Sequence, residues 1–366
     1  LTAMTIVSSH NTDREAASSW DAKDREARSR ETVSQHQTTG SQQQDETFFD
    51  ANMSSLRPTL LDEYIGQESL KRQIKRAIAS AKAREASLEH ILLYGPPWLG
   101  KTTLAAIVAR EMSVPVVLSS GASIDKPSDL VSLLTGLQPG SILFIDEIHR
   151  LKPHLEEILY IALEDYRVDI LVGTGVGAKS VSITLPPFTL IGATTKLSKI
   201  AAPLRDRFGN VYKLEYYNHE ELGIIARRTF GLFGYEYGWE HILIESISAR
   251  SRGTPRITNR LVKYIRDHLI LSGWTIDAPT LDILFDELGI DQYGLTPLDR
   301  AYLQTLMPDP GKSPKHKWLT TLAAFLSEEI DTVESVVEPY LLQRWYIERT
   351  PRGRIITSRW IEAIEP

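Results

Sequence analysis

The 366-residue sequence contains no cysteine, which excludes disulfide bonds, thiolate catalysis and zinc sites built from cysteine. It also lacks an apolar run of about 18 residues, so no transmembrane helix and no membrane partner are predicted. The first residues lack the apolar core of a secretory signal, and we therefore expect a cytoplasmic protein. The formal net charge is −6, so any contact with DNA requires a local cluster of basic residues.

Four segments of different composition follow one another along the chain. Residues 1–52 are rich in Ser, Thr, Gln and charged residues, and are predicted to form a disordered tail. Residues 53–217 alternate buried-strand and helix patterns, which predicts an α/β domain with a parallel sheet. Residues 218–288 show only helical patterns and are predicted to form a small helical domain. Residues 289–366 contain helices followed by two short strands around a basic turn, which is typical of a winged helix.

The stretch GPPWLGKT matches a phosphate-binding loop between a predicted strand and a predicted helix. In such loops the backbone N–H groups and the helix N-terminus bind phosphate oxygens. Gly95 and Gly100 bound the loop, Lys101 brings a positive charge, and Thr102 offers a hydroxyl to Mg²⁺. Trp98 lies in the middle of this loop, where it either points outward or strains the backbone. The alternative interpretation is a chance match in a Gly-rich turn.

Acidic and hydroxyl residues end two further strand patterns. Asp146 and Glu147 close the apolar run ILFIDE, where the first suits Mg²⁺ and the second can polarise the attacking water. Thr195 ends LIGATT and is expected at the same sheet edge, near the γ-phosphate. Arg207 in RDR is a candidate for an arginine that acts on a neighbouring subunit's nucleotide. A surface ion pair with Asp206 is the structural alternative.

Basic residues gather at two other places. The predicted start of a helix in the helical domain carries three arginines, one of which could reach the nucleotide: Arg252, Arg256 and Arg260. The predicted wing carries three arginines as well: Arg349, Arg352 and Arg354. Arginines on a narrow hairpin can contact phosphates and the minor groove without reading sequence. The wing therefore supplies a local basic cluster, unless it is simply a solvated turn.

Together with strings such as LRPTLLDEYIGQ, LFIDEIHRL, LPPFTLIGATT, PLRDRFG and RTPRGR, these motifs resemble the RuvB family over residues 56 to about 360. RuvB proteins are hexameric AAA+ motors that drive branch migration of Holliday junctions. The resemblance implies an α/β fold with an AAA+ P-loop NTPase domain, a helical lid domain and a C-terminal winged helix. It also implies ATP and Mg²⁺ as cofactors, a hexameric ring, and a RuvA-type partner. Duplex DNA at four-way junctions would be bound without sequence specificity.

The resemblance implies roles for individual residues. Expected contacts to the adenine are Leu56, Arg57 and Tyr217. Expected contacts to the phosphates and Mg²⁺ are Lys101, Thr102, Thr103 and Asp146. The expected catalytic carboxylate, which polarises the attacking water, is Glu147. The expected sensors and trans-acting arginine are Thr195, Arg256 with Arg260 nearby, and Arg207. The strip near the subunit interface would be Glu164, Asp165 and Tyr166. The hairpin at 168–185 would dock on RuvA through Val181 and Ile183.

Several positions depart from the family pattern. Trp98 stands where the family has glycine, and Ile330 stands where relatives have an arginine that contacts DNA. Lys179 and Lys196 replace arginines, and PDPGKSPKHKWL replaces a compact Gly-rich turn. Two other functions are therefore weighed beside the branch-migration motor. One is a divergent paralogue with weak ATPase activity that acts as a nucleotide-binding DNA scaffold. The other is a clamp-loader-type ATPase, which the hairpin and wing strings disfavour.

Overall fold

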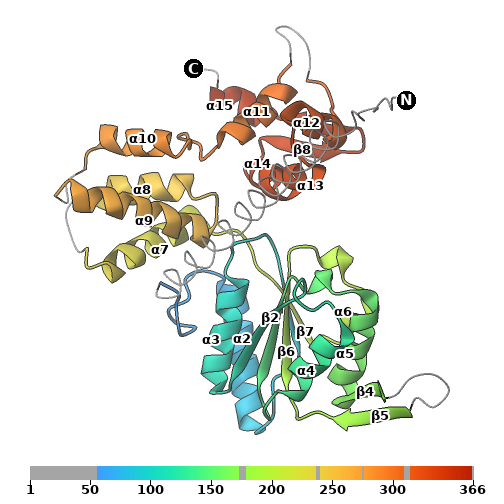
Figure 1. Ribbon diagram of the computed structural model, residues 1–366. Helices are drawn as coiled ribbons and strands as arrows, with labels where there is room; N and C mark the ends of the chain where they lie inside the picture. The colour runs from blue at the N-terminus through green and yellow to red at the C-terminus, as the bar shows by residue number, and fades with distance from the viewer. Residues whose placement is uncertain (1–55, 173–178, 236–239, 274–275, 309–313, 365–366) are drawn as a thin grey trace, which may run out of the picture. The chain divides into compact units, whose positions relative to one another are not determined.

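The computed structural model describes residues 56–172, 179–235, 240–273, 276–308 and 314–364. The predicted disordered tail at residues 1–52 lies outside these ranges. The chain divides into two units, Leu1–Arg57 and Pro58–Pro366, and the second holds all the helices and strands discussed below (Figure 1).

A five-stranded parallel sheet forms the centre of the α/β domain. Its strand order is β2 (Val116–Ser120), β3 (Ile142–Asp146), β6 (Thr189–Thr194), β1 (Ile91–Tyr94) and β7 (Asn210–Lys213). All four neighbouring pairs run parallel. Every residue of β6 is buried, because apolar side chains on both faces are covered, as the continuous apolar runs predict. The parallel arrangement places the ends of β1, β3 and β6 at one edge of the sheet.

Helices cover both faces of this sheet (Figure 1). One core lies under α2 (Glu68–Ala83) and α3 (Lys101–Met112). The opposite core lies under three helices: α4 (Pro127–Thr135), α5 (Pro153–Asp165) and α6 (Ala202–Asp206). Short 3-10 turns follow β3 and β6, namely η1 (Ile148–Arg150) and η3 (Leu197–Lys199). After α5 the chain forms an antiparallel pair, β4 (Arg167–Val172) with β5 (Lys179–Thr184).

The remaining elements belong to two smaller cores. The helical domain contains α7 (His219–Leu232), α8 (Glu240–Arg250), α9 (Pro255–Leu271) and α10 (Ala278–Glu287). The C-terminal domain contains α11 (Pro297–Leu306), α12 (Leu319–Leu326), α13 (Ile330–Thr332), the π-helical segment η4 (Val333–Val337), α14 (Glu338–Gln343), β8 (Ile347–Thr350), β9 (Gly353–Ile356) and α15 (Ser358–Ile364). The α/β fold with a helical lid and a C-terminal winged helix, predicted from the sequence, is confirmed.

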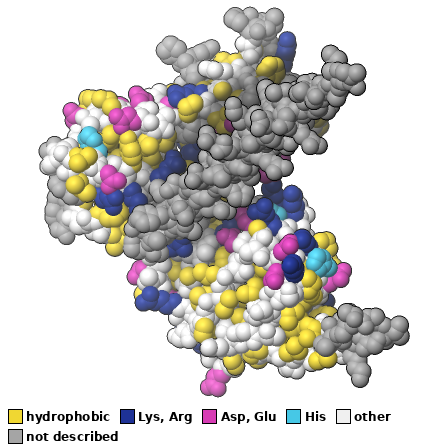
Figure 2. All heavy atoms as spheres, in the orientation of Figure 1, with side chains coloured by type: hydrophobic (Ala, Val, Ile, Leu, Met, Phe, Trp, Pro, Cys, Tyr) yellow, Lys and Arg dark blue, Asp and Glu magenta, His cyan; other side chains and the backbone are white. Residues whose placement is uncertain are grey.

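Within the described ranges, no helix is both long and apolar enough to cross a membrane. On the face shown in Figure 2, Lys and Arg side chains are interspersed with acidic ones rather than gathered into one patch. With a net charge of −6, any contact with DNA would require a local cluster of basic residues.

Candidate nucleotide and DNA sites

The phosphate-binding loop connects β1 to α3 and turns so tightly that two of its positions require glycine. Gly95 has a φ of 149°, and a Cβ there would lie 2.5 Å from the carbonyl oxygen of Leu214. Gly100 has a φ of 93°, and a Cβ there would lie 2.9 Å from the hydroxyl of Tyr64. These conformations are costly for any residue with a side chain. The two glycines of the motif are therefore explained by backbone geometry.

The ammonium group of Lys101 lies inside this loop. Its Nζ donates to the carbonyl oxygens of Gly95 at 3.0 Å and of Pro96 at 2.8 Å. Burial lowers the pKa of Lys101, while the nearby charges of Glu147 and Asp146 raise it. A lysine held in this way supplies the positive charge that the terminal phosphates of a nucleotide need.

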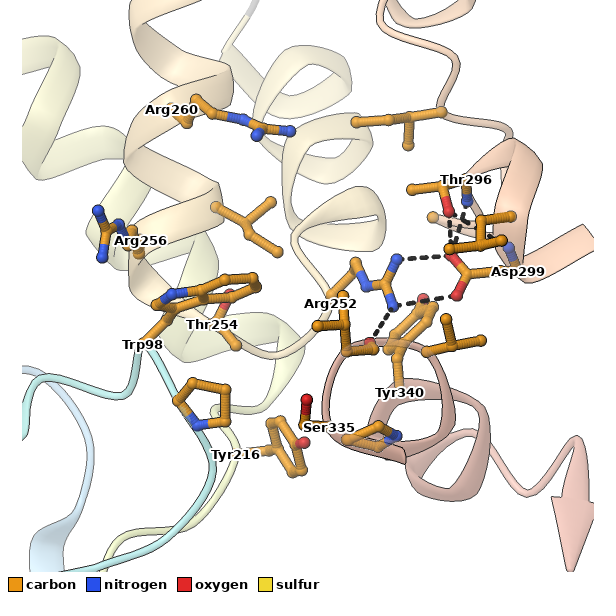
Figure 3. Close-up of a pocket in the computed structure, with 18 residues that line it drawn as sticks. Trp98, Tyr216, Arg252, Thr254, Arg256, Arg260, Thr296, Asp299, Ser335 and Tyr340 are labelled. Carbon is orange, nitrogen blue, oxygen red and sulfur yellow. Dashed lines mark hydrogen bonds and ion pairs between the residues drawn. The ribbon is translucent and has the colours of Figure 1, made fainter. Parts of the chain in front are cut away.

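Trp98 both strains the backbone and points outward, the two possibilities that the sequence left open. Its φ is 67°, a left-handed conformation that costs a residue with a side chain about 1–2 kcal/mol. Its indole nevertheless points out of the loop and lies beside Thr254 and Arg256, at the start of α9 (Figure 3). With Arg260 and Tyr216, these residues line a pocket of about 230 Å³. The indole therefore does not fill the phosphate position.

Two oxygen ligands lie together at the start of α3 and the end of β3. Thr102 Oγ1 is 3.4 Å from Asp146 Oδ2. Burial raises the pKa of Asp146, although a hydrogen bond from the Glu147 N–H opposes this shift. In the part of the chain that the structure describes, no group of three His, Cys, Asp or Glu side chains could hold a metal alone. The pair suits Mg²⁺, which keeps several waters and binds one or two protein ligands together with phosphates.

The carboxylate of Glu147 is held by the residue that follows β6 and by a residue of η1. Its Oε2 accepts hydrogen bonds from Thr195 N at 3.2 Å and from Thr195 Oγ1 at 3.1 Å. The same oxygen is 3.0 Å from His149 Nδ1, which in turn is 2.9 Å from Thr194 Oγ1. Burial lowers the pKa of His149 and favours its neutral form. The sequence prediction named Glu147 and Thr195 but missed His149, whose position two residues after Glu147 was the only available signal.

The predicted trans-acting arginine pairs with the strip predicted near the subunit interface. Arg207 follows α6, and its Nη2 is 2.7 Å from Oε2 of Glu164 near the end of α5. Its side chain is 37% exposed. Nearby, Asp165 pairs with Arg167 at 3.3 Å, and Tyr166 has a φ of 50°. The structure thus places Arg207 and the three residues of the strip together.

The residues predicted to contact the adenine differ in exposure. Tyr217 is only 5% exposed, and its hydroxyl donates to the carbonyl oxygen of Leu99 at 3.4 Å. Burial raises the pKa of Tyr217 well above its usual value. It therefore supports the backbone of the phosphate loop from within the core. Leu56 is buried and Arg57 is exposed, while Thr103 lies half-buried in the first turn of α3.

The three wing arginines do not have the same environment. Glu338 is fully buried, and its carboxylate accepts hydrogen bonds from Arg349 at 2.6 Å, Arg354 at 2.8 Å and Tyr302 at 2.9 Å. The guanidinium of Arg352 is exposed and has no hydrogen-bond or ion-pair partner among the described residues. Arg352 is therefore the wing arginine most available to a phosphate. No pattern in the sequence indicated that Glu338 would be buried.

Two positions that depart from the family pattern, Ile330 and Lys196, are linked through one ion pair. Ile330 begins α13 and is 47% exposed. The next residue, Asp331, pairs at 2.6 Å with Lys196, which directly follows Thr195. The C-terminal domain thereby contacts the segment in which Thr195 binds the carboxylate of Glu147.

The predicted docking hairpin presents one exposed apolar side chain among its described residues. Val181 pairs with Ile170 across the two strands and is 44% exposed, whereas Ile183 is half-buried. The side chain of Lys179 lies outside the described residues.

Comparison with known proteins identifies the family. Residues 56–214 match the P-loop domain of the Holliday junction DNA helicase RuvB, 217–291 match the RuvB AAA lid domain, and 292–365 match the RuvB C-terminal winged helix domain. A curated relative from Leuconostoc mesenteroides, named Holliday junction branch migration complex subunit RuvB, is 51% identical over 305 residues, which are 83% of this chain and 86% of the relative. The protein of the same name from Lacticaseibacillus casei is 49% identical over 304 residues, 83% of this chain and 89% of the relative.

A solved structure has the same fold. The Thermotoga maritima RuvB Holliday junction branch migration motor superposes with a TM-score of 0.74 at 41% identity, covering 85% of this chain and 98% of that one. The three matched domains correspond to the α/β domain, the helical domain and the C-terminal domain described above. The chain therefore belongs to the RuvB family of P-loop ATPases.

Proposed function

We propose that this chain is an ATP-driven DNA motor that moves the branch point of Holliday junctions, acting as a RuvB-type ring with a RuvA-type partner. The observation that carries the proposal is the arrangement at one sheet edge, where Lys101, Asp146 and Glu147 surround the phosphate loop. The names of the relatives support the same function for this family.

The residues at this edge would have different roles in phosphoryl transfer. The loop N–H groups and Lys101 bind the phosphates, and Thr102 with Asp146 would hold Mg²⁺. Mg²⁺ held by these two residues would supply positive charge beside the phosphates. Glu147 polarises the attacking water when its carboxylate turns from Thr195 toward the γ-phosphate. The hydrogen bond from Thr195 would therefore hold the glutamate back until the substrate is in place.

Hydrolysis would also require a neighbouring subunit. Arg207 is half-exposed and bound to Glu164, so its guanidinium can exchange one anionic partner for another. We infer that it leaves Glu164 and contacts the γ-phosphate at the adjoining subunit's site. Each γ-phosphate would thus meet two arginines. Arg207 would come from the neighbouring subunit, and Arg256 would come from the lid of the subunit that binds the nucleotide. Such sharing of a site between subunits favours a closed ring.

DNA and the partner protein would bind at two different places. The exposed guanidinium of Arg352 would contact backbone phosphates, with Arg349 and Arg354 supporting the wing through Glu338. Such contacts carry no sequence information, which suits a motor that moves along any duplex. The exposed Val181 on β5 would contact the RuvA-type partner.

ATP hydrolysis stimulated by four-way junction DNA and RuvA tests this function. The parent chain should hydrolyse ATP, whereas Lys101→Ala and Glu147→Gln should reduce turnover by about 100-fold or more. Lys82→Ala serves as the matched control, because Lys82 is an exposed lysine on α2. Turnover in Glu147→Gln equal to that of the parent would exclude the proposed mechanism.

A nucleotide-binding DNA scaffold with weak ATPase activity is the second candidate. The left-handed Trp98 in the phosphate loop and the exposed Ile330 near the sensor segment favour it. If this candidate holds, the parent turns over ATP very slowly and Trp98→Gly raises the rate. Rapid turnover by the parent removes it in favour of the motor.

A further inference from the structure

Two large aromatic side chains stand exposed on α12 of the C-terminal domain. Trp318 caps the helix and is 59% exposed, and Phe325 lies seven residues later and is 67% exposed. Seven residues make nearly two helical turns, so positions 318 and 325 fall on the same side of α12, about 10 Å apart along its axis. A tryptophan and a phenylalanine so exposed on one short helix offer two ring faces to a binding partner.

This aromatic surface, Trp318 with Phe325, directly adjoins the wing. Lys317 exchanges two backbone hydrogen bonds with Arg354 of β9, at 2.9 and 2.7 Å. A Cβ at Gly353 would lie 2.5 Å from the carbonyl oxygen of Lys317, so the two segments are packed as closely as glycine allows. Whatever contacts the wing tip therefore also passes close to Trp318.

The charges around the aromatic surface suit a nucleic acid strand. Lys317 Nζ donates to the carbonyl of Thr305 and lies 5.2 Å from the centre of the Phe325 ring, which fixes both side chains. Lys315 and Arg352 are exposed at the Trp318 end. Glu328 follows the Phe325 end, so the positive charge is concentrated toward the wing. Aromatic faces next to cations are the combination by which proteins bind bases and phosphates of a single strand.

We propose that Trp318 and Phe325 stack on unpaired nucleobases of a DNA strand that passes beside the wing. The inference rests on the proposed DNA-motor function and adds a second kind of contact to it. Arg352 would contact duplex phosphates, whereas the aromatic surface would bind only bases that are free of a partner strand. The separation of about 10 Å corresponds to roughly three nucleotides of a stacked strand at 3.4 Å each.

Binding of two fluorescent probes to the full chain tests the proposal: an oligothymidylate single strand and a blunt duplex of equal length. In fluorescence anisotropy, the double variant Trp318→Ala/Phe325→Ala should bind the single strand at least tenfold more weakly and the duplex within about twofold of the parent. The conservative variant Trp318→Phe/Phe325→Tyr should retain single-strand affinity, because both rings remain. Leu271→Ala, which removes an 88% exposed apolar side chain from the lid, is the matched control.

Stacking also has a spectroscopic signature. A single strand carrying 2-aminopurine should lose fluorescence on binding the parent, and less on binding the double alanine variant at saturation. Single-strand affinity of the alanine variant within twofold of the parent overturns the inference while leaving the motor function intact. A parent that binds neither probe overturns both. If the alanine substitutions leave both affinities unchanged but alter the sedimentation coefficient, the surface joins copies of this chain instead.

Discussion

Substitutions at Trp98 can measure the backbone strain in the phosphate loop. The residue's φ of 67° lies in the left-handed region, which favours glycine over any residue with a side chain. Replacement by alanine or by glycine removes the same indole, but only glycine also removes the conformational penalty of about 1–2 kcal/mol. The difference between the two variants therefore isolates the strain from the loss of side-chain contacts.

Thermal unfolding of Trp98→Ala and Trp98→Gly, monitored side by side, gives the magnitude. Alanine at a positive φ is destabilising, while glycine carries a smaller entropic cost in the unfolded chain. We expect a net difference of about 1 kcal/mol, which corresponds to a melting temperature about 2–4 °C higher for Trp98→Gly. An alanine variant that melts at the same temperature as the glycine variant, or higher, contradicts the assigned backbone conformation.

Nucleotide affinity provides the second test of the same loop. Gly95, Trp98 and Gly100 have positive φ values, and Lys101 lies inside the loop. A loop that keeps this conformation when it binds phosphate carries the same strain in both states, so the two Trp98 variants should bind a fluorescent ADP analogue with dissociation constants within about threefold of each other. A preference for glycine above about tenfold, or 1.4 kcal/mol, would mean that the loop changes conformation on binding.

Three further predictions concern buried or held side chains. His149→Ala should lower ATP turnover about tenfold while nucleotide affinity stays unchanged, because His149 orients Glu147; equal loss of affinity in titrations would contradict this role. Glu338→Gln should lower the free energy of unfolding by about 3 kcal/mol in urea, because it leaves two arginines without their carboxylate; a loss below about 1 kcal/mol would argue against the network. His90 accepts a hydrogen bond from Leu190 N at 3.0 Å, and burial lowers its pKa below 6.5. As the pH drops, the imidazole of His90 therefore gains its proton in the unfolded chain before it does so in the folded chain. The free energy of unfolding should fall as the pH drops below 6.5, and it should fall less in His90→Asn. Equal urea midpoints for the parent at pH 7.5 and 5.5 would contradict this prediction.

The fold was predictable because its strands and helices leave strong local patterns. The run ILFIDE becomes β3 with four of its five residues buried, and the P-loop lies between β1 and α3. Both follow from short-range features, namely an apolar run and a glycine-bounded turn. The placement of Asp146 at the sheet edge then follows from the parallel topology alone.

The partners of charged residues were not predictable in this way. Glu338 begins a helix and reads in sequence as an exposed acidic residue in the first turn, where it would complement the helix dipole. Its complete burial depends on α11, which brings Tyr302, and on the wing, which brings Arg354. Tyr302 and Arg354 lie 36 and 16 residues from Glu338 in the sequence, and no local pattern relates them.

The environment of the wing arginines changes what the basic cluster can do. Three arginines within six residues suggest three phosphate contacts, but Glu338 neutralises one charge and orients two of the guanidinium groups. Arg354 is only 15% exposed, so its departure from the carboxylate would leave the buried charge of Glu338 with one partner fewer. Arg352 remains the one arginine whose loss would remove a phosphate contact without disturbing the fold. On a duplex, the wing would therefore rely on a single arginine, and unpaired bases would find a separate contact at the exposed rings of Trp318 and Phe325.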